Sequence, residues 1–172
     1  MKINIENAKV KDAQTISNIH ALSWKFAYKN IVPQKYLDEL QSDFWTGHFT
    51  SWISNNTLRA KILYTDNTPV GCIAYGKSRD ESLPKWGEIV SVYVHPEHLR
   101  KGYGQRLLHT ALIDMKKYDY LNCYLWVLEL NENARYFYEL SGFKRNNDKY
   151  NFEIMNKPLT DVRYILDLKS YN

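Results

Sequence analysis

Hydrophobic and polar residues alternate with two different periods in the first third of the chain. Residues 3–8 (INIENA) alternate as a strand does. Asp12 is a residue type that caps helices, and the apolar positions after it keep helical spacing to about Tyr28: Ile16, Ile19, Trp24 and Ala27. A broken amphipathic pattern begins at Pro33 and predicts a second, kinked helical region that ends near residue 55.

The middle of the chain reads as three strands, a helix and a further strand. Residues 58–65 and 70–76 flank the turn sequence DNTP and predict a hairpin. Residues 88–94 (EIVSVYV) form a continuous apolar run, which predicts a central strand buried on both faces. An apolar stripe at helical spacing over 102–117 precedes a strand at 121–127, so we expect a right-handed crossover between two parallel strands.

The last third predicts a helix and two strands. In NENARYFYELSGF (131–143), Asn131 caps the helix and Gly142 ends it. The segments FKRNNDKYNFEIM and VRYILDL (162–168) predict two antiparallel strands. The order β α α β β β α β α β β predicts one α+β domain over residues 1–172, with a mixed central sheet of about seven strands and helices on both faces.

The composition indicates the cellular compartment of the protein but does not identify its function. The 172 residues carry a formal net charge of +4, and the two cysteines, Cys72 and Cys123, lie in apolar strands. This placement argues against a disulfide framework, and a reducing compartment, the cytoplasm, is expected. No apolar run suits a membrane span or a signal peptide, so we expect neither a membrane partner nor export. The mild positive charge suits a phosphorylated small ligand as well as nucleic acid.

Two glycines follow the central strand in VHPEHLRKGYGQRLL (94–108) and open the next helix. Gly102 and Gly104 allow a phosphate to approach the unpaired amides at the positive end of the helix dipole. Three basic residues add positive charge there: Arg100, Lys101 and Arg106. A surface turn is the alternative interpretation. The Rossmann fingerprint does not fit, because Leu107 occupies its third glycine position, and no Walker Gly-Lys-Ser/Thr ending is present.

Two motifs together resemble the GCN5-related N-acetyltransferase (GNAT) family. They are EIVSVYVHPEHLRKGYGQRLL (88–108), which is similar to the acetyl-CoA loop of the family, and NENARYFYELSGF (131–143), which is similar to its later helix. One position departs from the pattern: Leu99 stands where the family usually has Gln or Arg, and Arg100 is shifted by one place. Backbone amides hold most of a pyrophosphate in such a loop, so we expect binding with altered charge contacts.

The resemblance implies acetyl-CoA as cofactor and assigns residues to it. The backbones of Val92, Tyr93 and Val94 would pair with the pantetheine arm as an additional strand does. Asn131 would contact the same arm, and Tyr138 would lie near the sulfur. The pyrophosphate would be wrapped by six consecutive residues: Arg100, Lys101, Gly102, Tyr103, Gly104 and Gln105.

Acetyl transfer to an amine has three chemical requirements. An ammonium with a pKa near about 10.4 must lose a proton, and Glu88 is the candidate base, acting directly or through a water. An exposed carboxylate at a strand end is the alternative interpretation of Glu88. The amide of Val94 would stabilise the thioester oxygen, and Tyr138 would protonate the departing thiolate. A core position on the helix is the alternative for Tyr138.

The remaining candidates are aromatic and histidine side chains. Trp24 and Tyr28 belong to a helical segment that resembles the acceptor wall of bacterial GNAT proteins, and aromatic faces can hold an alkylammonium. Core packing is the alternative for Trp24. His95 and His98 lack an obvious third ligand, so no metal is expected. Both cysteines are interpreted as packing residues, because direct transfer needs no acyl-enzyme.

The leading hypothesis is an acetyl-CoA-dependent N-acetyltransferase that acts on a primary amine of a small molecule or peptide in a ternary complex. The alternative is a catalytically inactive CoA-binding module that senses or regulates. Nucleic-acid binding ranks last, because basic residues beyond the phosphate loop are spread along the chain. Exposed edges of the final strands could pair two subunits into a homodimer. No motif identifies the acceptor.

Overall fold

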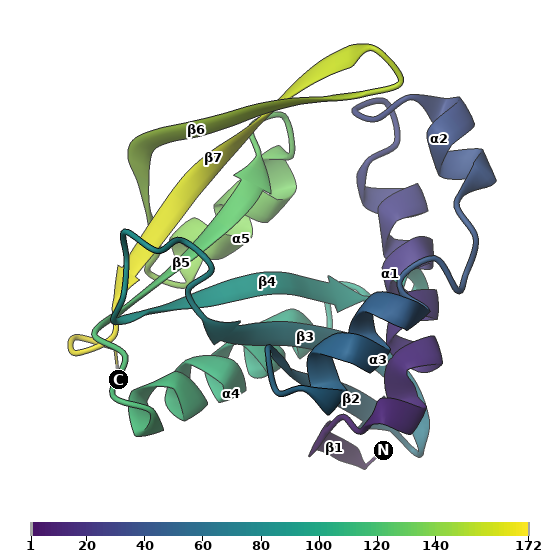
Figure 1. Cartoon of the computed structure of the whole chain (residues 1–172). Coiled ribbons are helices and arrows are strands. Elements are labelled where there is room, and N and C mark those ends of the chain that lie inside the picture. The colour runs from purple at the N-terminus through teal and green to yellow at the C-terminus, as the bar shows by residue number, and fades with distance from the viewer. Residues whose placement is uncertain (1, 172) are drawn as a thin grey trace.

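The computed structural model describes residues 2–171 and confirms the mixed sheet (Figure 1). Seven strands follow the spatial order β1-β2-β3-β4-β5-β7-β6, and all neighbours are antiparallel except the parallel pair β4 and β5. The strands are β1 (Ile3–Asn7), β2 (Arg59–Thr65), β3 (Thr68–Lys77), β4 (Trp86–Val94), β5 (Asn122–Leu128), β6 (Lys144–Ile154) and β7 (Lys157–Asp167).

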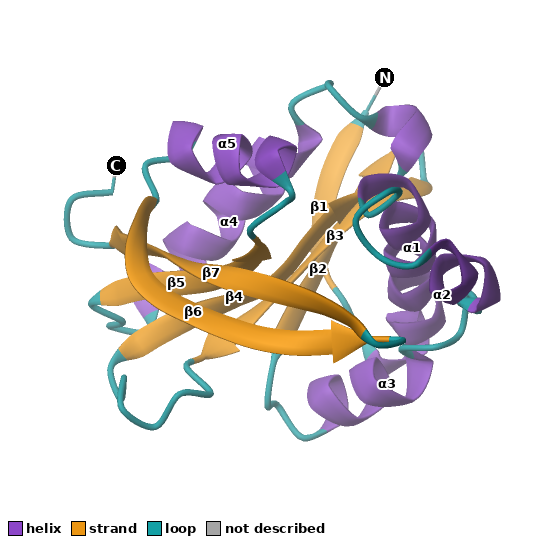
Figure 2. Ribbon diagram, turned by 90° about the horizontal axis from the view of Figure 1, so that it is seen from above, coloured by secondary structure: helices purple, strands orange, loops and turns teal. Residues whose placement is uncertain are grey.

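Helices cover both faces of the sheet, as expected. They are α1 (Ala13–Ala27), α2 (Gln34–Glu39), α3 (Thr46–Ser54), α4 (Tyr103–Lys117) and α5 (Glu132–Leu140), with short 3₁₀ turns at Val10–Asp12 and Pro96–His98. Figure 2 shows α4 and α5 together on one side of the sheet and α1, α2 and α3 on the other. None of the helices within residues 2–171 is long and apolar enough to cross a membrane.

The apolar stripe predicted for residues 102–117 forms the centre of the larger core. The buried side chains of α4 pack in this core with Ile73 of β3, Ile89 of β4 and Leu125 of β5. These α4 residues are Leu107, Leu108, Ala111, Leu112 and Met115. A second core lies between α1, α3 and the opposite face of β2 and β3. Cys72 and Cys123 are buried free thiols in these cores, which confirms their assignment to packing.

The structure corrects several boundaries. The predicted kinked helix after Pro33 is two separate helices, α2 and α3. Asp12 precedes α1, but its carboxylate accepts a hydrogen bond from the amide of Lys9 (2.7 Å) and does not cap α1. The turn between β2 and β3 contains only Asp66 and Asn67, both with positive φ, as two-residue hairpins prefer. The last strand begins at Lys157, before the predicted residue 162.

A β-bulge in β4 lies where the pairing of β4 with β5 ends. Tyr75 pairs with Ile89 and Ala74 pairs with Ser91, which leaves Val90 as the additional residue. Pairing between β4 and β5 ends at the same Ile89, and Figure 1 shows the two strands diverging beyond it. The prediction that residues 88–94 are buried on both faces is therefore wrong for the second half of β4, where Val92–Val94 are only half-buried.

The far end of the β6–β7 hairpin reaches the segment that joins α1 to α2 (Figure 2). A third apolar cluster joins them, in which Val32 and Leu37 pack with Leu128 and Leu159. Side chains of Phe152 and Ile154 on β6 support the cluster. The hairpin and the α1–α2 segment thus close one side of the space over β5 and β7.

Candidate functional site

One cavity passes through the gap between β4 and β5. Its volume is about 1780 Å³. It begins at the N-terminus of α4 beside Gly102, passes between Val94 and Tyr138, and opens over β5 and β7 near Asp161. A drug-sized ligand usually occupies a pocket of roughly 300 to 1,000 Å³. The cavity is therefore large enough for two ligands at the same time.

The N-terminus of α4 has the features of an anion site. Gly102 precedes the helix with φ 75° and provides no side-chain cap. Arg106 is bonded to the carbonyl of Gly102, which leaves the amides of Gly104 and Gln105 without an acceptor inside the helix. Arg100 adopts a left-handed φ of 58° and lines the cavity, so positive charge and open amides meet at this end.

Most of the residues predicted to hold a cofactor line this cavity. They are Val92, Tyr93, Val94, Arg100, Gly102, Tyr103, Gly104, Gln105, Asn131 and Tyr138. Lys101 is exposed and does not line it. The side chain of Tyr103 is buried in the larger core, which leaves its backbone for ligand contact. A Cβ on Gly104 would lie 3.3 Å from the ring of Phe137, a tight contact that the ring would have to relieve by shifting a few tenths of an ångström.

The second half of β4 presents backbone groups to the cavity. The amide of His95 is bonded to the carbonyl of Val70 in β3 (2.8 Å). Because bonded and non-bonded pairs alternate along antiparallel strands, the amides of Val92 and Val94 face away from β3, toward the gap. The hydroxyl of Ser23 in α1 donates to the carbonyl of Val94 (3.2 Å) and fixes this strand end. An extended ligand could pair with these amides.

Three tyrosines meet in the middle of the cavity. The hydroxyls of Tyr28 and Tyr93 lie 2.9 Å apart, and burial raises the pKa of Tyr28 to about 12. Burial also raises the pKa of Tyr138 above its ordinary value, and its hydroxyl makes no hydrogen bond to the residues that the structure describes. Tyr138 therefore stays protonated at neutral pH and can donate a proton or a hydrogen bond to a ligand in the cavity.

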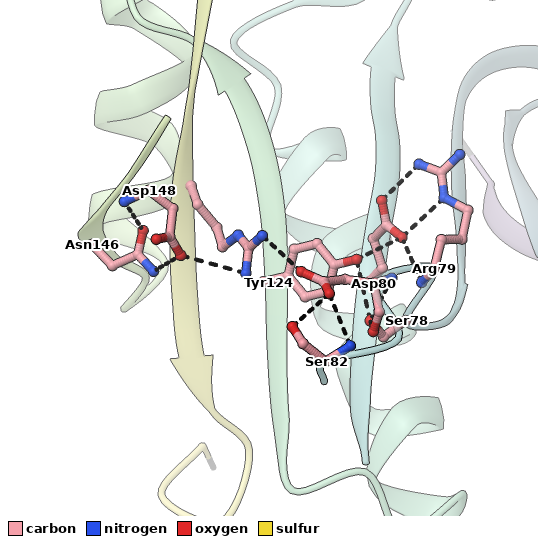
Figure 3. Close-up of polar contacts among 9 residues, drawn as sticks. Ser78, Arg79, Asp80, Ser82, Tyr124, Asn146 and Asp148 are labelled. Atoms are coloured by element: carbon pink, nitrogen blue, oxygen red, sulfur yellow. Dashed lines mark hydrogen bonds and ion pairs between the residues drawn. The ribbon is translucent and has the colours of Figure 1, made fainter. Parts of the chain in front are cut away.

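Glu88 is buried, which excludes the exposed strand-end carboxylate considered for it. Arg79 binds it through two nitrogens, Nη2 to Oε1 at 2.6 Å and Nε to Oε2 at 3.0 Å. The hydroxyl of Tyr124 donates to Oε2 at 2.9 Å. Arg79 lies on the loop that returns to the start of β4 (Figure 3). Glu88 lines the cavity but is held in this ion pair.

The same loop contributes a second ion-pair network that the sequence did not indicate. Asp80 binds Arg163 of β7 at 2.9 Å, and Asp148 of β6 approaches the same guanidinium at 3.4 Å (Figure 3). The guanidinium also lies 4.5 Å from the ring centroid of Trp126, at cation–π distance. The network connects the loop after β3 to the β6–β7 hairpin and forms one wall of the cavity.

Asn131 caps α5, and Trp24 lines the cavity. The side chain of Asn131 accepts a bond from the amide of Ala134 (3.2 Å) and caps α5, as predicted. Trp24 lines the cavity and also packs in the third apolar cluster, with its ring 4.7 Å from that of Tyr28. Trp24 is therefore both a lining residue of the cavity and a packing residue of the cluster.

Behind the cavity, His20 of α1 is buried among the rings of Trp45, Phe49 and Tyr93. Its Nε2 and the hydroxyl of Ser91 lie 3.2 Å apart. Burial lowers the pKa of His20 to about 3, so the ring is neutral at physiological pH. His20 supports the strand that carries the site and does not face the ligand space.

The histidines of the loop before α4 have a local role. The Nδ1 of His95 accepts from the amide of Glu97 at 3.3 Å and starts the 3₁₀ turn that leads to Leu99 and Arg100. No group of three or more His, Cys, Asp or Glu side chains within residues 2–171 has a metal-binding arrangement.

The sequence is similar to a known protein family and to two named acetyltransferases. A model of the acetyltransferase (GNAT) family matches residues 19–143. The chain is 26% identical over 161 residues to the uncharacterized N-acetyltransferase YuaI of Bacillus subtilis (strain 168), covering 93% of this chain and 90% of that protein. It is also 26% identical over 161 residues to the spermidine N(1)-acetyltransferase of Thermoplasma acidophilum, covering 84% of this chain and 89% of that protein.

The fold is similar to that of a crystal structure with a bound nucleotide cofactor. The PaiA N-acetyltransferase of Thermoplasma acidophilum in complex with coenzyme A superposes with a TM-score of 0.80. The superposition covers 97% of this chain and 99% of that chain, at 23% sequence identity.

Proposed function

The chain belongs to the acetyltransferase (GNAT) family, with acetyl-CoA as the donor, and on this premise we propose that it acetylates a primary amine of a small molecule or peptide by direct transfer in a ternary complex. The continuous cavity carries this proposal. An anion site lies at one end, protonated Tyr138 in the middle and an aromatic space at the other end. Donor and acceptor can therefore enter from opposite sides and meet at Tyr138.

The donor end fits coenzyme A through its backbone. The amides at the start of α4 and the side chain of Arg100 suit the pyrophosphate, and the amides of Val92 and Val94 suit the pantetheine arm. Because Arg100 lines the cavity from the position after Leu99, it supplies positive charge at the site despite the departure from the family pattern. Bound acetyl-CoA supplies an activated thioester.

Three groups of this chain would carry the chemistry. Glu88, directly or through a water, would take the proton of the amine, and Arg79 fixes the position of its carboxylate through the ion pair. The amide of Val94 faces the gap and would stabilise the thioester oxygen. Tyr138 would give its proton to the departing thiolate, since burial keeps its hydroxyl protonated.

The relatives support a small amine as acceptor. One of them is named a spermidine N(1)-acetyltransferase, and the two chains align over most of their lengths. The aromatic residues of the acceptor end, Trp24 and Tyr28 among them, can surround the methylene chain of such an amine.

The function is tested by measuring thiol release from acetyl-CoA in the presence of a panel of primary amines and N-terminal peptides. Amine-dependent release and an acetylated product are expected. Coenzyme A binding without amine-dependent release would contradict the proposal and would support the inactive binding module.

Replacement of Gly102 by Ala should weaken coenzyme A binding about 10-fold, which corresponds to about 1.4 kcal/mol. A side chain at φ 75° is strained, so the loop would relax and move its amides. Titration calorimetry measures the affinity. Gly47→Ala is the matched control, because both glycines have open space around a Cβ and Gly47 lies within α3 without positive φ. Equal affinities for both variants and the wild type would exclude Gly102 from the anion site.

A further inference from the structure

Asp161 is a carboxylate of the cavity that the proposed function does not use. It lies on β7, directly opposite Leu128 of β5 and Tyr150 of β6, so all three side chains point to the same face of the sheet. This is the face that forms the acceptor end of the cavity, and Asp161 lines it.

Asp161 differs from the other carboxylates that line the cavity. Glu88 is paired with Arg79, and Asp80 is paired with Arg163. Within residues 2–171, the carboxylate of Asp161 has neither a hydrogen bond nor an ion pair. It is half-buried, and loss of solvent raises its pKa to about 6, so it remains mostly ionised at pH 7.5. A partly buried anion without a partner favours a cationic ligand.

The surrounding groups make this preference specific. Arg163 lies two residues further along the same face, but Asp80 and Asp148 already bind its guanidinium. Tyr150 lies directly opposite Asp161, and Trp126 lies opposite Arg163, two residues further along β7. Further aromatic side chains line the same cavity: Trp24, Tyr28 and Phe152. A carboxylate in a cavity lined by aromatic rings suits an ammonium at the end of an apolar chain.

Asp161 is close to the tyrosines but is not the group that suits the reacting nitrogen. Burial and then the negative charge of Asp161 raise the pKa of Tyr28, which is bonded to Tyr93. An ammonium paired with Asp161 would be stabilised in its charged form, whereas the nitrogen that attacks the thioester must be neutral. The buried surroundings of Tyr138 penalise a charged group, which favours that neutral amine.

We propose that Asp161 binds a second, non-reacting ammonium of the acceptor, so that the preferred substrates are unbranched diamines and longer polyamines whose other nitrogen reaches Tyr138. This inference rests on the proposed function. Asp161 is a specificity residue in it, and its contribution appears in the KM of the diamine and not in the chemical step.

The test compares pairs of alkyl monoamines and α,ω-diamines of equal chain length. The wild type should show a kcat/KM about 30-fold higher for the diamine, the size of one charge-assisted hydrogen bond. Asp161→Asn should lower the diamine value about 30-fold, mainly through KM, and leave the monoamine value within about 2-fold. Asp161→Glu should keep the preference for diamines but shift it to shorter chains.

Glu153→Gln on the adjacent strand is the control, because it removes the same charge from an exposed position. It should behave as the wild type does. Equal wild-type activity on both members of a pair would overturn the proposal. An equal loss on both in Asp161→Asn would also overturn it and would indicate a base or a structural role. In either result, monoamine acetylation by the wild type would leave the proposed function standing, whereas no transfer to any amine would remove both.

Discussion

Tyr138→Phe should lower kcat about 100-fold while the affinity for coenzyme A stays within about 2-fold of the wild type. The substitution removes only the hydroxyl, and the ring contacts with Phe137 and Phe143 remain. The departing thiolate has a pKa near that of cysteine, about 8.5, so a proton donor matters most below that pH. Stopped-flow measurement of thiol release at pH 7 to 9 provides kcat, and calorimetry provides the affinity.

Tyr118→Phe is the matched control for this experiment. Tyr118 ends α4 away from the cavity, where its ring lies under Arg59, and a phenylalanine keeps that contact. Its turnover should equal that of the wild type. If Tyr138→Phe retains the wild-type rate across the pH range, Tyr138 is a packing residue and another group protonates the leaving thiolate.

Acidification should destabilise the fold through His20. Burial lowers the pKa of His20 from 6.5 to about 3, so between these values the unfolded chain binds a proton that the folded chain does not. The stability contributed by the neutral ring is complete above pH 6.5 and is lost as the pH falls toward 3. At pH 4.5 the loss is about 3 kcal/mol, two pKa units of about 1.4 kcal/mol each.

Asp161 acts in the opposite direction over part of this range. Its pKa is raised from 3.8 to about 6, so the folded chain binds a proton that the unfolded chain lacks, and stability increases as the pH falls from about 6 to 3.8. A comparison of wild type with His20→Gln cancels this contribution, because both chains contain Asp161. Urea unfolding should show that the wild type loses about 3 kcal/mol more than His20→Gln between pH 7.5 and 4.5.

The exposed histidine of α3 provides a control, since His48→Gln removes a histidine without changing the core. It should follow the pH dependence of the wild type. Parallel stability curves for the wild type and His20→Gln would show that the His20 ring accepts a proton in the folded state at little cost.

The sequence was sufficient to predict those elements whose apolar pattern or motif is formed by residues close together in the chain. The stripe from Leu107 to Met115 predicts α4 because five apolar residues at helical spacing can hardly be arranged otherwise. The glycine loop and the cap at Asn131 are equally local, since each depends on a few neighbouring residues. The split between α2 and α3 is less evident, because the apolar spacing continues across the break.

The sequence could not show which face of β7 remains open. Asp161 and Arg163 alternate with the buried residues Val162 and Tyr164, a pattern that equally describes a solvent-exposed face. Their place in the cavity depends on the bulge at Val90, which parts β4 from β5, and on contacts far apart in the chain. Glu88 illustrates the same limit: its partner Arg79 is reached only because the intervening loop folds back.

The two ends of the cavity are built from different stretches of the chain. The proposed donor end comes mainly from the continuous stretch between β4 and α5, whereas α1, β6 and β7 supply most of the walls of the proposed acceptor end. The β6–β7 hairpin and the segment after α1 meet through the small cluster around Val32 and Leu159. Mutations in these segments can therefore change the acceptor specificity without changing the residues that bind the donor. Diversification within a lineage of such enzymes should be concentrated in α1 and in the β6–β7 hairpin.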